Sequence, residues 1–162
     1  MQNAKDTFYL TLRNRLATVN PARAMTLRSV SRPGILVEDA EPFIPQPQLD
    51  AFTLRWTSLQ ADLHLPAILA QMTCEIHYTT AGTQANAGLD RGRALETMDY
   101  ELLRLLYPYA AQKMNYTQTP AVALATLVFW SEPEFSPAVT DHDRLSRIAK
   151  VTVFAFQEVN EA

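Results

Sequence analysis

Cysteine is nearly absent from the sequence, which has only Cys74 among its 162 residues. No intramolecular disulfide can form, so the chain suits a reducing cytosol and secretion gains no support. Long apolar runs are also missing, and none approaches the roughly 20 residues of a membrane-spanning helix. The opening segment MQNAKDTFYLTLRNRL is too polar and charged for a signal peptide. These absences predict a soluble domain of intracellular type.

The sequence also lacks an excess of positive charge. It carries 14 Lys plus Arg against 17 Asp plus Glu, a formal net charge of -3. This balance provides no basic surface for tight nucleic-acid binding and no polybasic signal for membranes. Glycine is scarce too, and the 4 glycines match neither a Walker loop nor a dinucleotide-binding fingerprint. We therefore expect neither specific nucleic-acid binding nor a membrane partner.

Two segments of the chain have the apolar spacing of amphipathic helices. Phe8, Leu12, Leu16 and Val19 form one stripe, and Pro21 should end that helix. A stronger stripe follows Gly92 and consists of Leu95, Met98, Leu102, Leu105 and Leu106. Asp90 precedes this second stripe and is expected to be its N-cap. The eleven residues from Gly82 to Gly92 contain three of the 4 glycines and should form the most flexible connection.

Strand patterns account for most of the remaining sequence. AMTLRSV and GILVEDAE predict a hairpin around a turn at SRPG. DAFTLRWTSL and AILAQMTCEIHYTT alternate apolar and polar residues, and ALATLVFWSE and RIAKVTVFAFQEV are rich in strand-forming residues. A proline-rich segment, Glu41–Leu49, reads as a strap between strands. With 48% hydrophobic residues, the chain predicts a single α+β domain over residues 1–162, a twisted, mainly antiparallel sheet with two helices.

The stretch MTCEIHYTTAG places a thiol, a carboxylate and an imidazole within four positions. On a strand, however, successive side chains point to opposite faces, so Cys74 and His77 should point apart. Cys74 therefore has no base within reach and is interpreted as a small hydrophobic residue. Glu75 and His77 share a face, and we interpret them as part of the polar side of the strand.

Two functional alternatives stay open at this point. The first is a small enzyme or metal-dependent hydrolase, in which Glu75 and His77 meet a residue of the Asp141–Asp143 loop, such as His142. The second is a ligand-binding module that uses the groove between sheet and helix. We favour neither, and assign no catalytic, cofactor-binding or metal-ligating residue and no cofactor. The segment TDHDRLS is interpreted as a turn or helix cap.

The order of these elements resembles the tail terminator and minor tail proteins of long-tailed bacteriophages. The similarity is greatest from Met72 to Leu106, where a long strand runs through a small-residue loop into the helix RALETMDYELLRLL, which ends in a leucine pair. The resemblance implies a structural, non-enzymatic subunit of a ring, usually a hexamer, that caps the tail tube and joins it to the head. It implies a place in the virion after assembly in the bacterial cytoplasm, with other tail and head-joining proteins as partners.

A ring subunit needs two different contact surfaces, because head-to-tail contacts join unlike patches. Two apolar loop tips could provide them: Phe43 and Ile44 in the proline-rich strap, and Phe135 in the loop PEFSPAVTDHD. We therefore predict Phe43, Ile44 and Phe135 as interface residues. The alternative for the strap is that it folds back on its own sheet.

Overall fold

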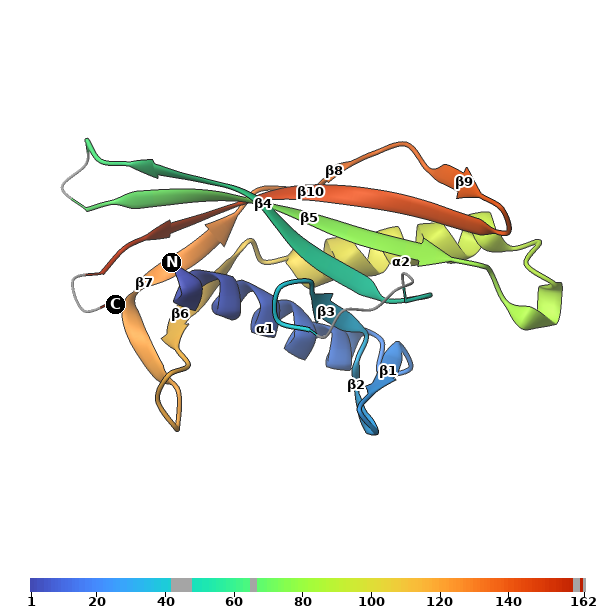
Figure 1. Cartoon of the computed structure of the whole chain (residues 1–162), viewed down its shortest axis with the longest axis horizontal. Helices are drawn as coiled ribbons and strands as arrows, with labels where there is room; N and C mark the ends of the chain where they lie inside the picture. The colour runs from blue at the N-terminus through green and yellow to red at the C-terminus, as the bar shows by residue number, and fades with distance from the viewer. Residues whose placement is uncertain (42–47, 65–66, 159–160, 162) are drawn as a thin grey trace.

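The computed structural model of the chain describes residues 1–41, 48–64, 67–158 and 161. In this part of the chain, two α-helices lie on one side of a long, curved sheet (Figure 1). The elements are α1 (Gln2–Val19), β1 (Ala24–Leu27), β2 (Val30–Pro33), β3 (Ile35–Val37), β4 (Phe52–Asp62), β5 (Leu69–Thr80), the 3₁₀ helix η1 (Gln84–Asn86), α2 (Arg91–Leu106), β6 (Ala110–Asn115), β7 (Val122–Trp130), β8 (Glu134–Phe135), β9 (Val139–Asp141) and β10 (Arg144–Phe156). The predicted α+β fold with two helices is confirmed.

The main sheet is built around β10. Its strand order is β3-β4-β5-β10-β7-β6, and β8 and β9 also pair with β10. β5 and β10 are antiparallel over their whole length, from Leu69 opposite Phe156 to Thr80 opposite Leu145. Among the described strands of this sheet, β3 and β4 are the only parallel pair, so the prediction of a mainly antiparallel sheet is confirmed. β1 and β2 form a separate two-stranded ribbon.

The alternation in β5 determines which face of the sheet is covered. Met72, Cys74 and Ile76 are completely buried and Tyr78 is 3% exposed, whereas the residues between them are partly exposed until Thr79. Because side chains alternate along a strand, the buried set faces the helices. In the part of the chain that the structure describes, neither α1 nor α2 lies over the opposite side of the sheet, which we call the open face (Figure 1).

Each helix buries the stripe that the sequence predicted. Phe8, Leu12 and Leu16 of α1 are fully buried, and Asn20 ends this helix one residue before Pro21. In α2 the residues of the predicted stripe are all at most 2% exposed: Leu95, Met98, Leu102, Leu105 and Leu106. Burial of these two stripes against one face of the sheet forms the core.

Two ion-pair networks fix α2 in place. Asp99 accepts a hydrogen bond from the Tyr78 hydroxyl and pairs with Arg147, which ties the helix to β5 and β10. Burial, followed by this hydrogen bond, raises the pKa of Tyr78 well above its ordinary value. Two residues further along α2 and on another side of the helix, the buried Glu101 pairs with Arg23 and accepts a hydrogen bond of 2.7 Å from Asn20. The helix is therefore anchored at both its sheet side and its α1 side.

The predicted hairpin near residue 30 is wrong in its turn and its second strand. The turn lies at Arg28 and Ser29, both with positive φ, and β2 continues through the segment expected to bend. Ile35–Val37 instead pairs in parallel with β4, with Ile35 opposite Phe52. All three residues of β3 are buried. Burial of this apolar triplet in the core therefore outweighs the turn preference of the Pro-Gly pair.

The glycine-bearing loop before α2 is organised around Asp90. Its carboxylate accepts hydrogen bonds from the Thr83 amide and hydroxyl and from the Asn86 amide group, at 2.7 to 3.0 Å. These bonds, those from Thr83 first, lower the pKa of Asp90 to about 2. Asp90 occupies the N-cap position, but its side chain makes no capping bond to α2. Gly82 has φ +74°, and a Cβ there would meet the Asp90 carboxylate at 2.6 Å, so the loop requires glycine.

Candidate assembly surfaces

The structure separates the thiol of Cys74 from the imidazole of His77. Cys74 is fully buried in the core cluster, and burial raises the pKa of its thiol far above the ordinary value. His77 lies on the opposite face of β5, where its side chain is 35% exposed. The interpretation of Cys74 as a small hydrophobic core residue is confirmed.

Glu75 and His77 do come together on the open face. A Glu75 carboxylate oxygen lies 3.0 Å from His77 Nε2. His142 is elsewhere, in the turn between β9 and β10, where it is 91% exposed and contacts Asp141 at 2.6 Å. Among the residues that the structure describes, no group of three or more His, Cys, Asp and Glu side chains is arranged to hold a metal ion. The open face thus brings together an acid and a base, without the Asp141–Asp143 loop.

We expect His77→Ala to change the free energy of unfolding by less than about 0.5 kcal/mol, because its ring is partly solvated and makes one polar contact. Urea unfolding of the variant and of the wild type, at pH 7 and in the presence and absence of Zn²⁺, measures the change. Thr73→Ala, on the same face of the same strand, is the matched control. A loss of Zn²⁺-dependent stabilisation specific to His77→Ala would instead support the metal-site alternative.

The predicted interface residues have different outcomes. Phe43 and Ile44 lie outside the described residues, so their role stays a prediction. Phe135 lies in β8, opposite Ala149 of β10, and is 36% exposed. Val139 of the neighbouring β9 is 61% exposed. By register, Phe135 shares the face of the buried Ala149 and Val139 shares that of Ser146, so the two side chains lie on opposite faces of this sheet edge. We call this edge, which runs beside the half of β10 that precedes Lys150, the β8–β9 patch.

A second apolar surface, which the sequence analysis did not identify, lies on the open face at the other end of β10. Phe154 is directly opposite Phe129 of β7, and Phe156 is directly opposite Leu69 of β5. Leu127 shares the face of Phe129, and these two residues are 39% and 43% exposed. We call the five residues the open-face patch. The signal was present in VTVFAFQ, where apolar residues occupy both alternating positions and predict a strand that is covered on both sides.

A cavity of about 230 Å³ lies near the end of α1, against the β1–β2 ribbon rather than between the sheet and a helix. Asn20, Arg23 and Arg32 provide its polar groups. Both guanidinium groups already have acidic partners, since Arg23 pairs with Glu101 and Arg32 with Glu41. The cavity therefore offers little free positive charge to an anionic ligand.

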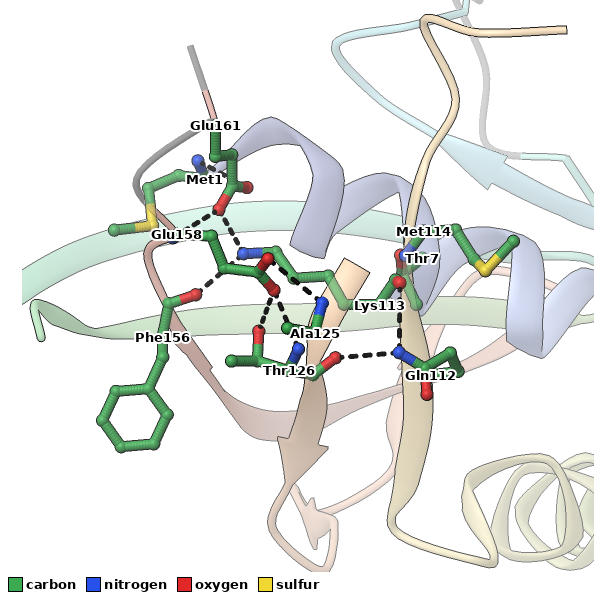
Figure 2. Close-up of polar contacts among 10 residues, drawn as sticks. All are labelled: Met1, Thr7, Gln112, Lys113, Met114, Ala125, Thr126, Phe156, Glu158 and Glu161. Atoms are coloured by element: carbon green, nitrogen blue, oxygen red, sulfur yellow. Dashed lines mark hydrogen bonds and ion pairs between the residues drawn. The ribbon is translucent and has the colours of Figure 1, made fainter. Parts of the chain in front are cut away.

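The two ends of the chain meet in a buried ion pair (Figure 2). Lys113 of β6 is completely buried, pairs with Glu161 and donates a hydrogen bond of 2.8 Å to the Phe156 carbonyl. The amino group of Met1 lies 3.3 Å from the other Glu161 oxygen. Burial by itself raises the pKa of Glu161, but the hydrogen bond from Lys113 and the nearby cations outweigh it, so the pKa is lowered.

Among the described residues, none of the helices is both long and apolar enough to cross a membrane. In comparisons with models of known protein families and with curated proteins, nothing matches this chain.

Proposed function

We propose that this protein is a structural subunit that assembles head to tail into a ring and acts as a phage or prophage tail terminator. In this role the ring caps the tail tube and contacts tail and head-joining proteins. It is assembled in the bacterial cytoplasm and becomes part of the virion. The family resemblance in the order of elements supports the terminator role, and the two separate apolar patches support the mode of assembly.

The positions of the two patches carry the proposal of head-to-tail assembly. The open-face patch includes Phe154 and Phe156, whereas the β8–β9 patch lies beside Ser146 and Ala149. Ser146 and Phe156 are ten residues apart on one strand, which corresponds to about 33 Å. The two patches differ in their residues and lie toward opposite ends of β10. They fit a heterologous contact, in which one end of a subunit binds the other end of the next.

The test uses one charged substitution in each patch. Phe129→Lys disables the open-face patch and Phe135→Lys disables the β8–β9 patch, because a lysine in a desolvated apolar contact is unfavourable. Each variant alone is expected to form no rings. An equimolar mixture still has one intact contact, between the wild-type patch of each partner, so the mean mass in light scattering should rise about twofold over the separate solutions.

Leu89→Lys is the matched control, because Leu89 is 93% exposed and lies in the loop before α2. This variant should assemble like the wild type, and negative-stain images of both should show rings. If the mixture of Phe129→Lys and Phe135→Lys gains no mass, the two patches are not complementary. A wild-type protein that stays monomeric at high concentration and with purified tail tubes would contradict the proposal of a ring.

A further inference from the structure

The outer edge of β4 is open along its second half. β3 pairs only with Phe52–Leu54, and a bulge interrupts the β4–β5 ladder between Trp56 and Ser58. Beyond the bulge, Ser58–Asp62 pairs regularly with β5, and each of its five residues is exposed. Within the described residues, no strand pairs with this segment on the side away from β5. Its outward N–H and C=O groups are thus free to accept another strand.

On the other long edges of the sheet, side chains already bond some of the backbone groups. On β6, the Met114 amide donates to the Thr7 hydroxyl at 3.0 Å, and Arg15 donates to the Ala110 carbonyl at 3.3 Å. On β7, Glu158 accepts hydrogen bonds from the amides of residues 125 and 126, at 3.1 and 2.8 Å. The remaining edges in the described residues belong to strands of four residues or fewer. In a second copy of the chain, the edge best suited to pair with this segment is therefore the same segment of β4.

The segment is self-complementary when it is paired antiparallel about Gln60. This register places Ser58 opposite Asp62 and Leu59 opposite Ala61, so the one charge of the segment does not meet its own copy. The exposed Leu59, at 56%, would then lie beside a second apolar side chain. Lysine and proline, the residues that usually protect an edge strand, are both absent from the segment.

We infer that two copies of this protein pair through Ser58–Asp62 of β4, antiparallel and with Gln60 on the two-fold axis, so that two sheets join into one. This contact is isologous and goes beyond the proposed function, because it uses neither of the two patches of the ring contact. It joins free subunits in pairs and, in the presence of rings, joins two rings face to face.

Opposite charges at position 60 test the two-fold register. In Gln60→Lys and in Gln60→Glu, like charges face each other about 5 Å apart across the axis. Each variant is expected to weaken dimerisation by about tenfold, measured by sedimentation equilibrium. An equimolar mixture of the two pairs opposite charges, so its dimerisation should return to the wild-type level or exceed it. Leu89→Lys is again the control, with unchanged dimerisation expected.

The experiment is done in the Phe129→Lys background, so that failure of this contact and failure of the ring are distinguishable. Dimers are expected there, and Gln60→Lys should weaken their association by the same factor of about ten. Amide hydrogen exchange of residues 58–62 should slow with rising protein concentration, and that of β6 should not. A Phe129→Lys variant that remains monomeric up to about 1 mM, or a Lys plus Glu mixture that dimerises no better than either variant, would overturn the inference.

Discussion

Replacing Phe8 with Ala is expected to lower the free energy of unfolding by about 3 to 5 kcal/mol. Phe8 is completely buried on α1, and its ring makes edge-to-face contacts with Trp56 of β4 and Trp130 of β7, at centroid distances of 5.8 and 5.1 Å. Trp130 in turn donates a hydrogen bond of 2.8 Å to the Leu106 carbonyl at the end of α2. Removal of the ring leaves a cavity at the point where both halves of the sheet meet the helices.

Urea unfolding followed by tryptophan fluorescence measures this change, because both tryptophans line the vacated site. Tyr100→Ala is the matched control: this aromatic residue of α2 is 64% exposed and should cost less than about 1 kcal/mol. A loss below about 1 kcal/mol for Phe8→Ala, with an unchanged slope against urea, would contradict the position of α1 on the sheet.

Replacing Glu161 with Ala is expected to have an effect of similar size, about 3 to 5 kcal/mol. The change leaves the ammonium group of Lys113 fully buried, and the Phe156 carbonyl is then its remaining hydrogen-bond partner among the described residues. The double variant Lys113→Met/Glu161→Ala should recover much of the loss, since a side chain of similar volume then replaces the unpaired cation. Glu132→Ala, at an exposed position, is the control for removal of a carboxylate.

The effect of Glu161 should depend on pH in one direction. Its pKa is lowered in the folded protein, so its ionised form stabilises the fold above the ordinary value of 4.5. This contribution is lost as the pH falls through the lowered pKa. The difference in stability between the wild type and Glu161→Ala should therefore be largest near pH 7 and decrease below about pH 4. A difference that grows with acid would contradict the ion pair.

The local patterns predicted most of the helices and strands. The stripes of α1 and α2 have the period of a helix, and the alternation from Met72 to Tyr78 has the period of a strand, so each could be recognised from neighbouring residues. The same alternation correctly placed Cys74 and His77 on opposite faces. The strands β6, β8 and β9 were missed, because AAQKMN of β6 does not alternate and β8 and β9 have only two and three residues. Each forms by pairing with β7 or β10.

The candidate surfaces were harder to predict than the fold. Phe135 was identified because it is an apolar residue in a polar loop, a local signal. The open-face patch was not, because the strands that contain Phe129 and Phe154 appear suited to burial on both sides, and only the sheet shows that one side has no cover. The free edge of β4 likewise depends on the residue at which its pairing with β3 ends. No pattern in the sequence of β4 indicates that residue.

The sequence by itself determined the periods of the two helices and the long strands, because those depend on which side chains lie two, three or four positions apart. The tertiary structure alone decided which partner each strand takes, as for β3 beside β4, and that Lys113 is buried opposite Glu161. Those features arise between residues far apart in the chain, where the gain comes from burial and charge pairing that no local pattern contains.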